Sequence, residues 1–457
     1  MTTSSMKHLA GVLLLAGAFA ACGDFLSGPE LTTDPNRPST ADMAQLLQGV
    51  QLNQFSFHTG DLARNAAMWT QQMAGTSQQY IDRDLYNIVE GDFDFYFTLV
   101  YTGGGLVDMR NIERMADESG DRVYGGIAKV WEAYQMGMAA SMWGDIPYSE
   151  AVSDVEQPVL DPQEDVYAAV QTLLDGAIAD LQSGSGTGPG ATDLVYAGDP
   201  SLWTQAAYTL KARFYLHWVE AQDAGMAQAA TACGGDCVAG ALAAAQNGIA
   251  SSAADFQTYQ ADPPGEQNFW YQFMTVFRPG YISAGQYLVD LLQTRGDPRL
   301  TEYFAATSSG QVVGVPPGTS STASALSDSR GAPDFNQPLI THAENELILA
   351  EVFARQGDDT QATTHLNNAR ALAGLAAITP APADLMQEIM TEKYIALFQN
   401  IEAWNDYKRT CVPDLTPATG TEVPGRLLYG STERDSNDNI PSPDEQPARN
   451  RNDPNGC

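Results

Sequence analysis

The stretch AENELILAEVFARQGDDTQATTHLNNARALAG, residues 343–374, decides the fold. Apolar side chains recur at helical spacing before and after the dipeptide Gly357-Asp358, which predicts two helices joined by a tight turn. Small side chains such as those of Ala362 and Ala369 allow two helices to approach closely, and larger apolar side chains fill the groove between them. We therefore expect an antiparallel helix pair here.

The spacing also fits the tetratricopeptide repeat, a two-helix unit that stacks into superhelical scaffolds. Two positions depart from that repeat, because Glu346 stands where an aromatic residue is usual and Gly374 where proline is usual. Weaker helix pairs recur near residues 123–182, 201–251 and 384–410, with longer insertions between them. The sequence thus predicts a mainly α fold in which four irregular tetratricopeptide-type pairs, the quoted one spanning 341–374, form a superhelical scaffold.

Other segments lack the helical period. Residues 305–337 are rich in Ser, Gly and Pro and indicate a long loop, and residues 183–190, SGSGTGPG, indicate a surface connector. We expect the polar tail from Ser431 onward to be extended and held by contacts or a disulfide.

Composition excludes one class of partner. The chain has 457 residues, with 23 Lys plus Arg against 56 Asp plus Glu, for a net charge of −33. Such a surface repels phosphate backbones and anionic head groups, so we expect no nucleic-acid partner. With 44% hydrophobic residues, the chain can bury a large core.

The first residues have the features of an export signal. Lys7 precedes an apolar run and small residues, so residues 1–21 are expected to be a signal peptide and residues 22–457 a single domain. The sequence Phe19-Ala20-Ala21-Cys22 resembles a bacterial lipobox, in which lipid is attached to the cysteine and the chain is cut just before it, although Phe19 replaces the usual aliphatic residue. The alternative is ordinary cleavage and a secreted product.

Four further cysteines suit two disulfides in an oxidising compartment. Cys233 and Cys237 lie close enough in sequence to pair with each other, which leaves Cys411 to pair with Cys457. The five His residues are scattered, so no zinc site, and no other metal or cofactor, is predicted.

The sequence WGDIPYSEA, residues 143–151, follows a long predicted helix. Gly permits a left-handed cap and Pro cannot continue the helix, so the physical meaning is a helix end with two aromatic side chains to pack. This stretch also resembles a signature of the SusD/RagB family of outer-membrane nutrient-binding lipoproteins. Further similar segments follow in the family's order: Asp34-Pro35-Asn36, Trp203–Arg213, Gly296–Leu300, Glu392–Phe398, Glu402–Trp404, Tyr407–Arg409, and Val423–Arg426 with Tyr429.

The resemblance implies a lipid-anchored protein on the cell surface that captures oligosaccharides or peptides. It implies delivery of them to a SusC-like TonB-dependent transporter in the outer membrane, with no enzyme activity. It also implies that four tetratricopeptide pairs support a loop-rich, ligand-facing half, which we place near residues 55–110 and 256–337.

Two segments have the composition of a sugar site, where aromatic rings stack on sugar rings and polar groups bond the hydroxyls. They are residues 69–97, with Gln78 and Gln79, and residues 256–287, with Arg278 and Tyr281. The candidate ligand residues are Trp270, Tyr271, Tyr80, Trp69, Arg83 and Asn268. For each aromatic residue, the alternative is packing in the core.

Two other function classes stay open. A tetratricopeptide-type scaffold would bind only proteins, and a secreted glycan hydrolase would need two carboxyl groups facing across a cleft. Pairs such as Asp92 and Asp94 are expected by chance among 56 acidic residues and give no such geometry. The glycine run at residues 103–105 lacks the Lys-Ser/Thr of a phosphate loop, and His217 lies among apolar neighbours typical of a core.

Overall fold

The computed structural model describes residues 41–457 apart from Thr322. The predicted signal peptide, residues 1–21, and the predicted lipid site, Cys22, lie outside the described residues. The chain divides into a first unit, residues 1–45, and a second unit, residues 46–457, which carries nearly all the described structure.

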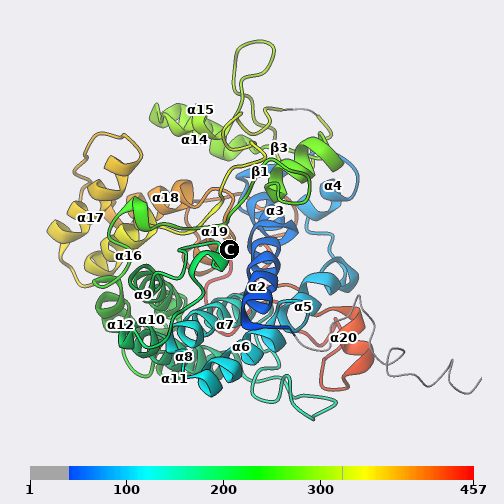
Figure 1. Ribbon diagram of the computed structural model, residues 1–457. Coiled ribbons are helices and arrows are strands. Elements are labelled where there is room, and N and C mark those ends of the chain that lie inside the picture. Colours follow the sequence, from blue (N-terminus) through cyan, green and yellow to red (C-terminus); the bar gives the residue numbers. More distant parts are fainter. Residues whose placement is uncertain (1–40, 322) are drawn as a thin grey trace, which may run out of the picture. The chain divides into compact units, whose positions relative to one another are not determined.

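The fold is mainly helical, as the sequence predicts (Figure 1). The first half contains α2 (Met43–Thr59), α3 (Asp61–Trp69), α4 (Gln79–Asp84), η2 (Glu90–Asp92), α5 (Asp94–Tyr101), α6 (Leu106–Ser119), α7 (Arg122–Trp143), α8 (Gln163–Ser183), η3 (Gly190–Thr192), α9 (Pro200–Leu216) and α10 (Val219–Asp223). The second half contains α11 (Ala227–Cys233), α12 (Cys237–Ala245), η4 (Ser252–Ala254), α13 (Phe269–Tyr271), η5 (Gln272–Phe277), α14 (Gln286–Arg295), α15 (Arg299–Tyr303), α16 (His342–Arg355), α17 (Asp359–Leu372), α18 (Leu385–Ala396), α19 (Glu402–Thr410) and α20 (Ser431–Ser436).

The quoted stretch forms the packed pair α16–α17. The Thr341 hydroxyl caps α16 by accepting the backbone N–H of Glu344 at 3.1 Å, and Asp358 caps α17 in the same way. Gly357 makes the turn between them at a φ of 77°, which favours glycine. The pair and α18 share one buried apolar cluster of Leu347, Ala350, Ala362, Leu366, Ala369, Leu385 and Ile389.

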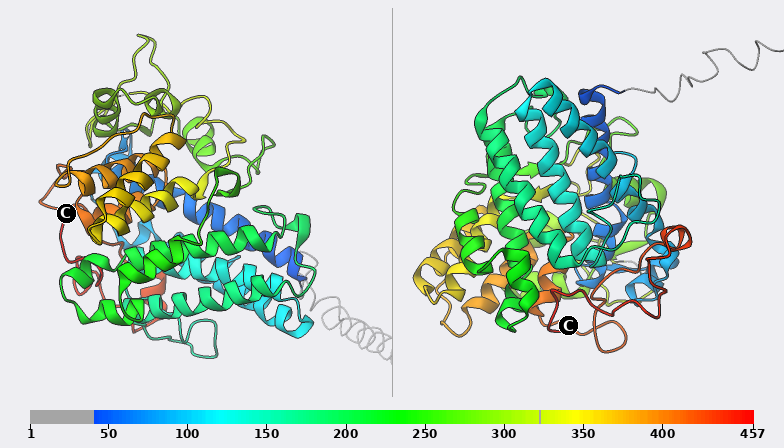
Figure 2. Two further views of the ribbon diagram at one scale, coloured as in Figure 1. Left: turned by 90° about the vertical axis from the view of Figure 1, so that its left-hand side faces the viewer. Right: turned by 90° about the horizontal axis from the view of Figure 1, so that it is seen from below.

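The helices before residue 250 form a second packed group. In it α7 packs against α6 and α8, and α9 packs against α8 and α12, so these helices lie side by side (Figure 2). In the pair predicted near residues 201–251, α9 ends at Leu216 and α10 begins at Val219. His217, between them, is buried and its ring contacts Tyr167 and Glu402. In the same segment α12 ends at Ala245, and the backbone N–H of Ile249 beyond it donates to the Thr209 hydroxyl at 2.9 Å.

The part of the chain that the structure describes contains four short strands, which form two-stranded sheets. β1 (Met73–Gly75) pairs antiparallel with β3 (Ile282–Ala284), and β2 (Phe256–Gln257) with β4 (Pro338–Ile340). The described part of the segment from 305 to 337 contains turns and isolated bridges, as predicted. The segment 55–110, expected to be rich in loops, is largely helical, because its apolar positions pack as the short helices α3 to α6.

The WGDIPYSEA stretch joins the end of α7 to the C-terminal segment. The Trp143 indole Nε1 donates to the Leu428 carbonyl at 2.9 Å, and the Tyr148 hydroxyl donates to Glu132 at 2.8 Å. Asp145 pairs with Arg451 at 2.7 Å. The stretch thus fixes a helix end and the tail beside it.

The tail is tied down at several points. A disulfide joins Cys411 to Cys457 and another joins Cys233 to Cys237, the two pairs that the cysteine count predicts. The tail was expected to be extended, but it contains the short helix α20, where Ser431 donates to Asp94 at 2.7 Å. None of the helices in residues 41–457 has the length and apolar character needed to cross a bilayer.

Candidate functional site

The β1–β3 pairing brings together the two segments with the composition of a sugar site. Beyond the strands, the Thr76 backbone N–H donates to the Tyr281 carbonyl at 2.8 Å, and the Thr76 hydroxyl donates to the Gly280 carbonyl at 2.9 Å. Residues 69–97 and 256–287 are far apart in sequence, but here they lie side by side (Figure 1). This junction is our candidate functional site.

A buried carboxylate, Asp61, organises the polar part of the junction. It accepts the Tyr80 hydroxyl at 2.5 Å and pairs with both Arg83 and Arg64. Burial alone would raise the pKa of Asp61, but the two guanidinium groups and the hydroxyl bring that pKa below its ordinary value. Arg83 also reaches Asp92 at 3.0 Å, so α3, α4 and η2 are joined through one ionic network.

Aromatic rings connect this network to the second segment. The Tyr80 ring lies 4.9 Å from the Phe273 ring and 6.2 Å from the Tyr281 ring, centroid to centroid. The Arg64 guanidinium lies over the Phe273 ring at 4.2 Å. Each of these three rings therefore packs against the other two.

The structure buries most of the predicted ligand residues. Trp69 and Trp270 are 0% exposed and Tyr80 is 4% exposed, so none of the three offers a ring face to a ligand in this structure. Asn268 is also buried, and its side chain caps α13 by accepting the backbone N–H groups of Trp270 and Tyr271.

Arg83 and Tyr271 are half-buried. Arg83 is occupied by its two carboxylates, and its carbonyl accepts the Trp69 indole Nε1 at 2.9 Å. The structure brings Trp69, Tyr80 and Arg83 together in one group, and Asn268, Trp270 and Tyr271 in another.

Two exposed apolar residues at the junction were not singled out from the sequence. Phe277 is 61% exposed and Val276 is 51% exposed, and both lie at the end of η5, a π-helix. The widened last turn is closed by the backbone N–H of Arg278, which donates to the Phe273 carbonyl at 2.8 Å. Short π-helical turns are frequent at functional sites.

A tight turn follows and fixes the next side chain. Residues 278–281 form the turn, which the Tyr281 backbone N–H closes by donating to the Arg278 carbonyl at 3.2 Å. Pro279 is its second residue, and Gly280, at a φ of 77°, is its third. Proline followed by glycine is the signature of a type II turn. That signature, visible in the sequence as Pro279-Gly280, could have indicated that the residues just before it project outward.

Asp84 connects the junction to the long loop of residues 305–337. One of its carboxylate oxygens, Oδ2, accepts the backbone N–H of Gly75 at 3.0 Å and that of Gly318 at 2.9 Å. The other, Oδ1, has no hydrogen-bond partner. Burial raises the pKa of Asp84 to about 7.

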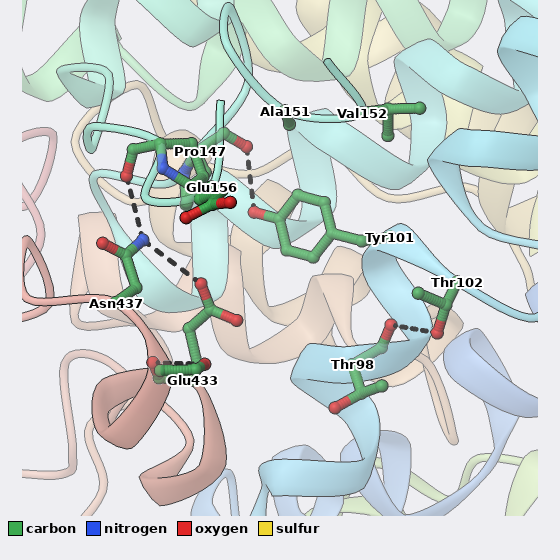
Figure 3. A pocket seen from close by; sticks show the side chains of 11 residues that line it. Thr98, Tyr101, Thr102, Pro147, Ala151, Val152, Glu156, Glu433 and Asn437 are labelled. Carbon is green, nitrogen blue, oxygen red and sulfur yellow. Dashed lines mark hydrogen bonds between the residues drawn. The ribbon is translucent and has the colours of Figure 1, made fainter. Parts of the chain in front are cut away.

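A separate pocket of about 260 Å³ lies between α5, the loop after WGDIPY and α20 (Figure 3). Tyr101 forms one wall, with its hydroxyl donating to the Pro147 carbonyl at 2.9 Å. Glu156 and Glu433 line the same pocket, and Asn437 donates to Glu433 at 3.4 Å. Figure 3 shows no aromatic ring on this pocket besides Tyr101, so it offers less stacking surface than the junction.

Within the described range of the chain, no three His, Cys, Asp or Glu side chains are grouped so as to hold a metal ion. The fold is mainly helical, and two segments that are distant in sequence meet at the candidate site. A family model described as starch-binding, associating with the outer membrane, matches residues 35–430. The chain belongs to this family, the SusD-like proteins, which confirms the resemblance seen in the sequence.

Solved structures show the same fold. A SusD/RagB family protein from Bacteroides thetaiotaomicron is 20% identical, with a TM-score of 0.70 over 88% of this chain and 95% of the other. A chitin-binding SusD homolog from Flavobacterium johnsoniae is 19% identical, with a TM-score of 0.73 over 90% and 97%. A SusD homolog from Bacteroides uniformis is 18% identical, with a TM-score of 0.73 over 91% and 100%. None of the curated proteins matches the chain.

Proposed function

We propose that this protein is a cell-surface lipoprotein, anchored through Cys22, that captures oligosaccharides and passes them to a SusC-like TonB-dependent transporter. The family's description as starch-binding and associated with the outer membrane supports the class of ligand and the place. A relative of the same fold binds chitin, which also favours a glycan over a peptide. The proposed role is binding, without an enzyme activity of its own.

The observation that carries the proposal is the exposed surface of the β1–β3 junction. Phe277 offers a free aromatic ring, Tyr271 is half-buried nearby in sequence, and the amides of Gln78 and Gln79 are exposed on the neighbouring segment. Rings that stack on sugars and amides that bond hydroxyls are the groups such a site requires. In this proposal the buried residues Trp69, Tyr80, Asn268 and Trp270 and the half-buried Arg83 position the site, and Tyr271 contacts the ligand as the sequence predicts.

Calorimetric titration with maltohexaose and chitohexaose tests the glycan site. Phe277→Ala should weaken binding of whichever oligosaccharide binds by about tenfold, since an aromatic contact contributes on the order of 1–1.5 kcal/mol. Phe95→Ala is the matched control, because Phe95 is 62% exposed on α5, outside the junction. Equal losses in the two variants would reject the junction as the glycan site.

The transporter and the anchor need a second experiment. Gentle detergent extraction from the outer membrane should recover the protein with a large TonB-dependent barrel at near-equal abundance. Cys22→Ala should release the protein from membranes and leave its unfolding midpoint unchanged. A barrel missing from the wild-type extract, or a variant that stays on membranes after a high-salt wash, would contradict these parts of the proposal.

A further inference from the structure

Nearly every cation in this acidic protein has an acidic partner. Of the 23 Lys and Arg residues, Lys7 and Arg37 lie outside the described residues. Within residues 41–457, all the others except Arg278, Lys408 and Arg426 have a carboxylate oxygen at salt-bridge distance.

The three exceptions differ in burial. Lys408 is buried with its Nζ over the Trp404 ring at 3.9 Å and donates to the Ser141 carbonyl at 2.7 Å. Arg426 is also buried, over the Tyr429 ring at 4.7 Å. Arg278 is exposed. It is thus the one solvent-accessible cation of the described chain that no carboxylate neutralises.

This isolation is unusual for its surroundings. Acidic residues outnumber basic ones by 56 to 23, so an exposed guanidinium has many possible partners. The turn that follows Arg278 sets its direction, because the Tyr281 N–H bonds back to the Arg278 carbonyl. The guanidinium lies 5.7 Å from the Tyr281 ring centre, and Nη1 reaches only the Phe277 carbonyl, at 3.1 Å.

The remaining donors of Arg278 face no acceptor in the described structure. A guanidinium that already packs against a ring loses little side-chain entropy when it binds a ligand. Its planar array of N–H donors can form two parallel hydrogen bonds with one carboxylate. The preceding residue, Phe277, exposes an apolar ring on which a sugar can stack.

We infer that the ligand of this site is an acidic oligosaccharide, with a uronic acid carboxylate on Arg278 and a neighbouring sugar ring on Phe277. The inference rests on the proposed function and specifies its substrate class. The net charge of −33 repels anions at a distance, but salt screens that repulsion over about 8 Å at physiological ionic strength. The two charges of a direct ion pair at Arg278 lie much closer together than that screening length, so their attraction persists.

The experiment compares matched ligands that differ only in their carboxylates. Maltohexaose and cellohexaose are titrated against their C6-oxidised forms, with hexaglutamate as an acidic peptide of similar charge. The proteins are the wild type, Arg278→Gln and Arg114→Gln. Arg114 is the control because it is an exposed arginine on α6, paired with Glu118 at 2.7 Å, and its loss changes the net charge equally.

The wild type and Arg114→Gln should prefer an oxidised oligosaccharide by about fivefold, because an exposed ion pair contributes up to about 1 kcal/mol and a two-pronged arginine contact lies at the upper end of that range. In Arg278→Gln that preference should fall to about twofold or less, with the unfolding midpoint unchanged. A wild type that prefers the neutral forms, or a preference that survives in Arg278→Gln, would overturn the acidic-sugar inference and leave glycan binding intact.

Two further outcomes would also count against the acidic-sugar inference. Hexaglutamate binding as tightly as the oxidised sugars would show that the site recognises charge alone, which overturns the assignment to a sugar. Binding of none of these oligosaccharides would count against both the inference and the proposed glycan site.

Discussion

Arg409 and Glu351 form a two-pronged ion pair between α19 and α16, inside the protein. Nη1 donates to Oε1 at 2.6 Å and Nη2 donates to Oε2 at 2.7 Å, and both side chains are buried. Burial would raise the pKa of Glu351, but Arg409 and Arg355 hold it well below its ordinary value. The segment around α19, which contains the family-like stretches Glu402–Trp404 and Tyr407–Arg409, therefore ties the last helices to the scaffold.

Replacing Glu351 with Gln should lower the free energy of unfolding by about 3–5 kcal/mol at pH 7, because it removes the carboxylate that accepts from both Nη atoms of the buried Arg409. Arg409 then keeps only Asp406 and Glu220 as acidic partners. The pKa of Glu351 is depressed in the folded state, so its stabilisation is present above the ordinary value of 4.5 and is lost as the pH falls below it. Urea unfolding of both proteins between pH 3 and 7 measures this difference.

Glu118→Gln is the matched control for that substitution. Glu118 pairs with Arg114 at 2.7 Å, but both side chains are more than half exposed. An exposed pair contributes about 0–1 kcal/mol, so this variant should unfold near the wild-type midpoint. Similar losses of unfolding free energy in Glu351→Gln and Glu118→Gln would mean that burial does not determine the strength of the Glu351 ion pair.

The helices were predictable because their signals are local. The α16–α17 pair follows from apolar spacing, a glycine at the turn and capping residues, all within 34 residues of sequence. The β1–β3 pairing was not predictable, since each strand has three residues and Met73 pairs with Ala284 across the chain. Strands this short show no period of their own and are formed by the tertiary contacts around them.

The residue types of the candidate site could be recognised in the sequence. Which of those side chains reach the surface could not be predicted from it. Residues 69–97 and 256–287 were selected for their aromatic and amide side chains, and the structure brings these segments together. Composition does not tell which ring faces solvent, and here Trp270 lies inside while Phe277 lies outside. Burial of an aromatic ring depends on packing partners from other segments, such as the network around Asp61.

The two disulfides should differ in their effect on stability. Cys411 and Cys457 are 46 residues apart, whereas Cys233 and Cys237 are 4 apart. Since a longer closed loop restricts the unfolded chain more, Cys457→Ser should lower the free energy of unfolding by about 4 kcal/mol and Cys233→Ser by about 2 kcal/mol. Urea unfolding tests the order, and trypsin cleavage at Arg451 should accelerate only in Cys457→Ser. Equal losses would contradict the loop-length argument.

Asp84 should make stability depend on pH near neutrality. Its pKa is raised from 3.8 to about 7 by burial, so its contribution is fully present below the lower value and is lost as the pH rises toward 7. Asp84→Asn keeps an oxygen to accept the Gly75 and Gly318 amides but carries no charge. Relative to this variant, the free energy of unfolding of the wild type should fall by up to about 4 kcal/mol between pH 4 and pH 8.

Urea midpoints measured at several pH values provide the test for Asp84. Asp117→Asn is the control, because it makes the same change of side chain at an exposed position on α6. A constant difference between wild type and Asp84→Asn across this range would show that Asp84 does not titrate there.

Gly144, in the WGDIPYSEA stretch, should not tolerate a side chain. Its φ is 82° and its ψ is −119°, and an added Cβ would lie 2.8 Å from the Asn450 Oδ1. Asn450 is buried and donates to the Ser141 carbonyl at 2.6 Å, so it cannot move away without losing that bond. Gly144→Ala should therefore cost about 3 kcal/mol or more, combining backbone strain with a steric clash.

Gly120→Ala separates the backbone strain from the clash. Gly120 ends α6 at a φ of 74°, and a Cβ there would meet nothing within 4 Å, so only strain of about 1 kcal/mol is expected. Adding Asn450→Ala to each variant completes the comparison by urea unfolding. The second substitution should recover part of the loss in Gly144→Ala and none in Gly120→Ala, because only Gly144 contacts Asn450. Equal recovery in both would mean that Asn450 is not what requires glycine at the end of α7.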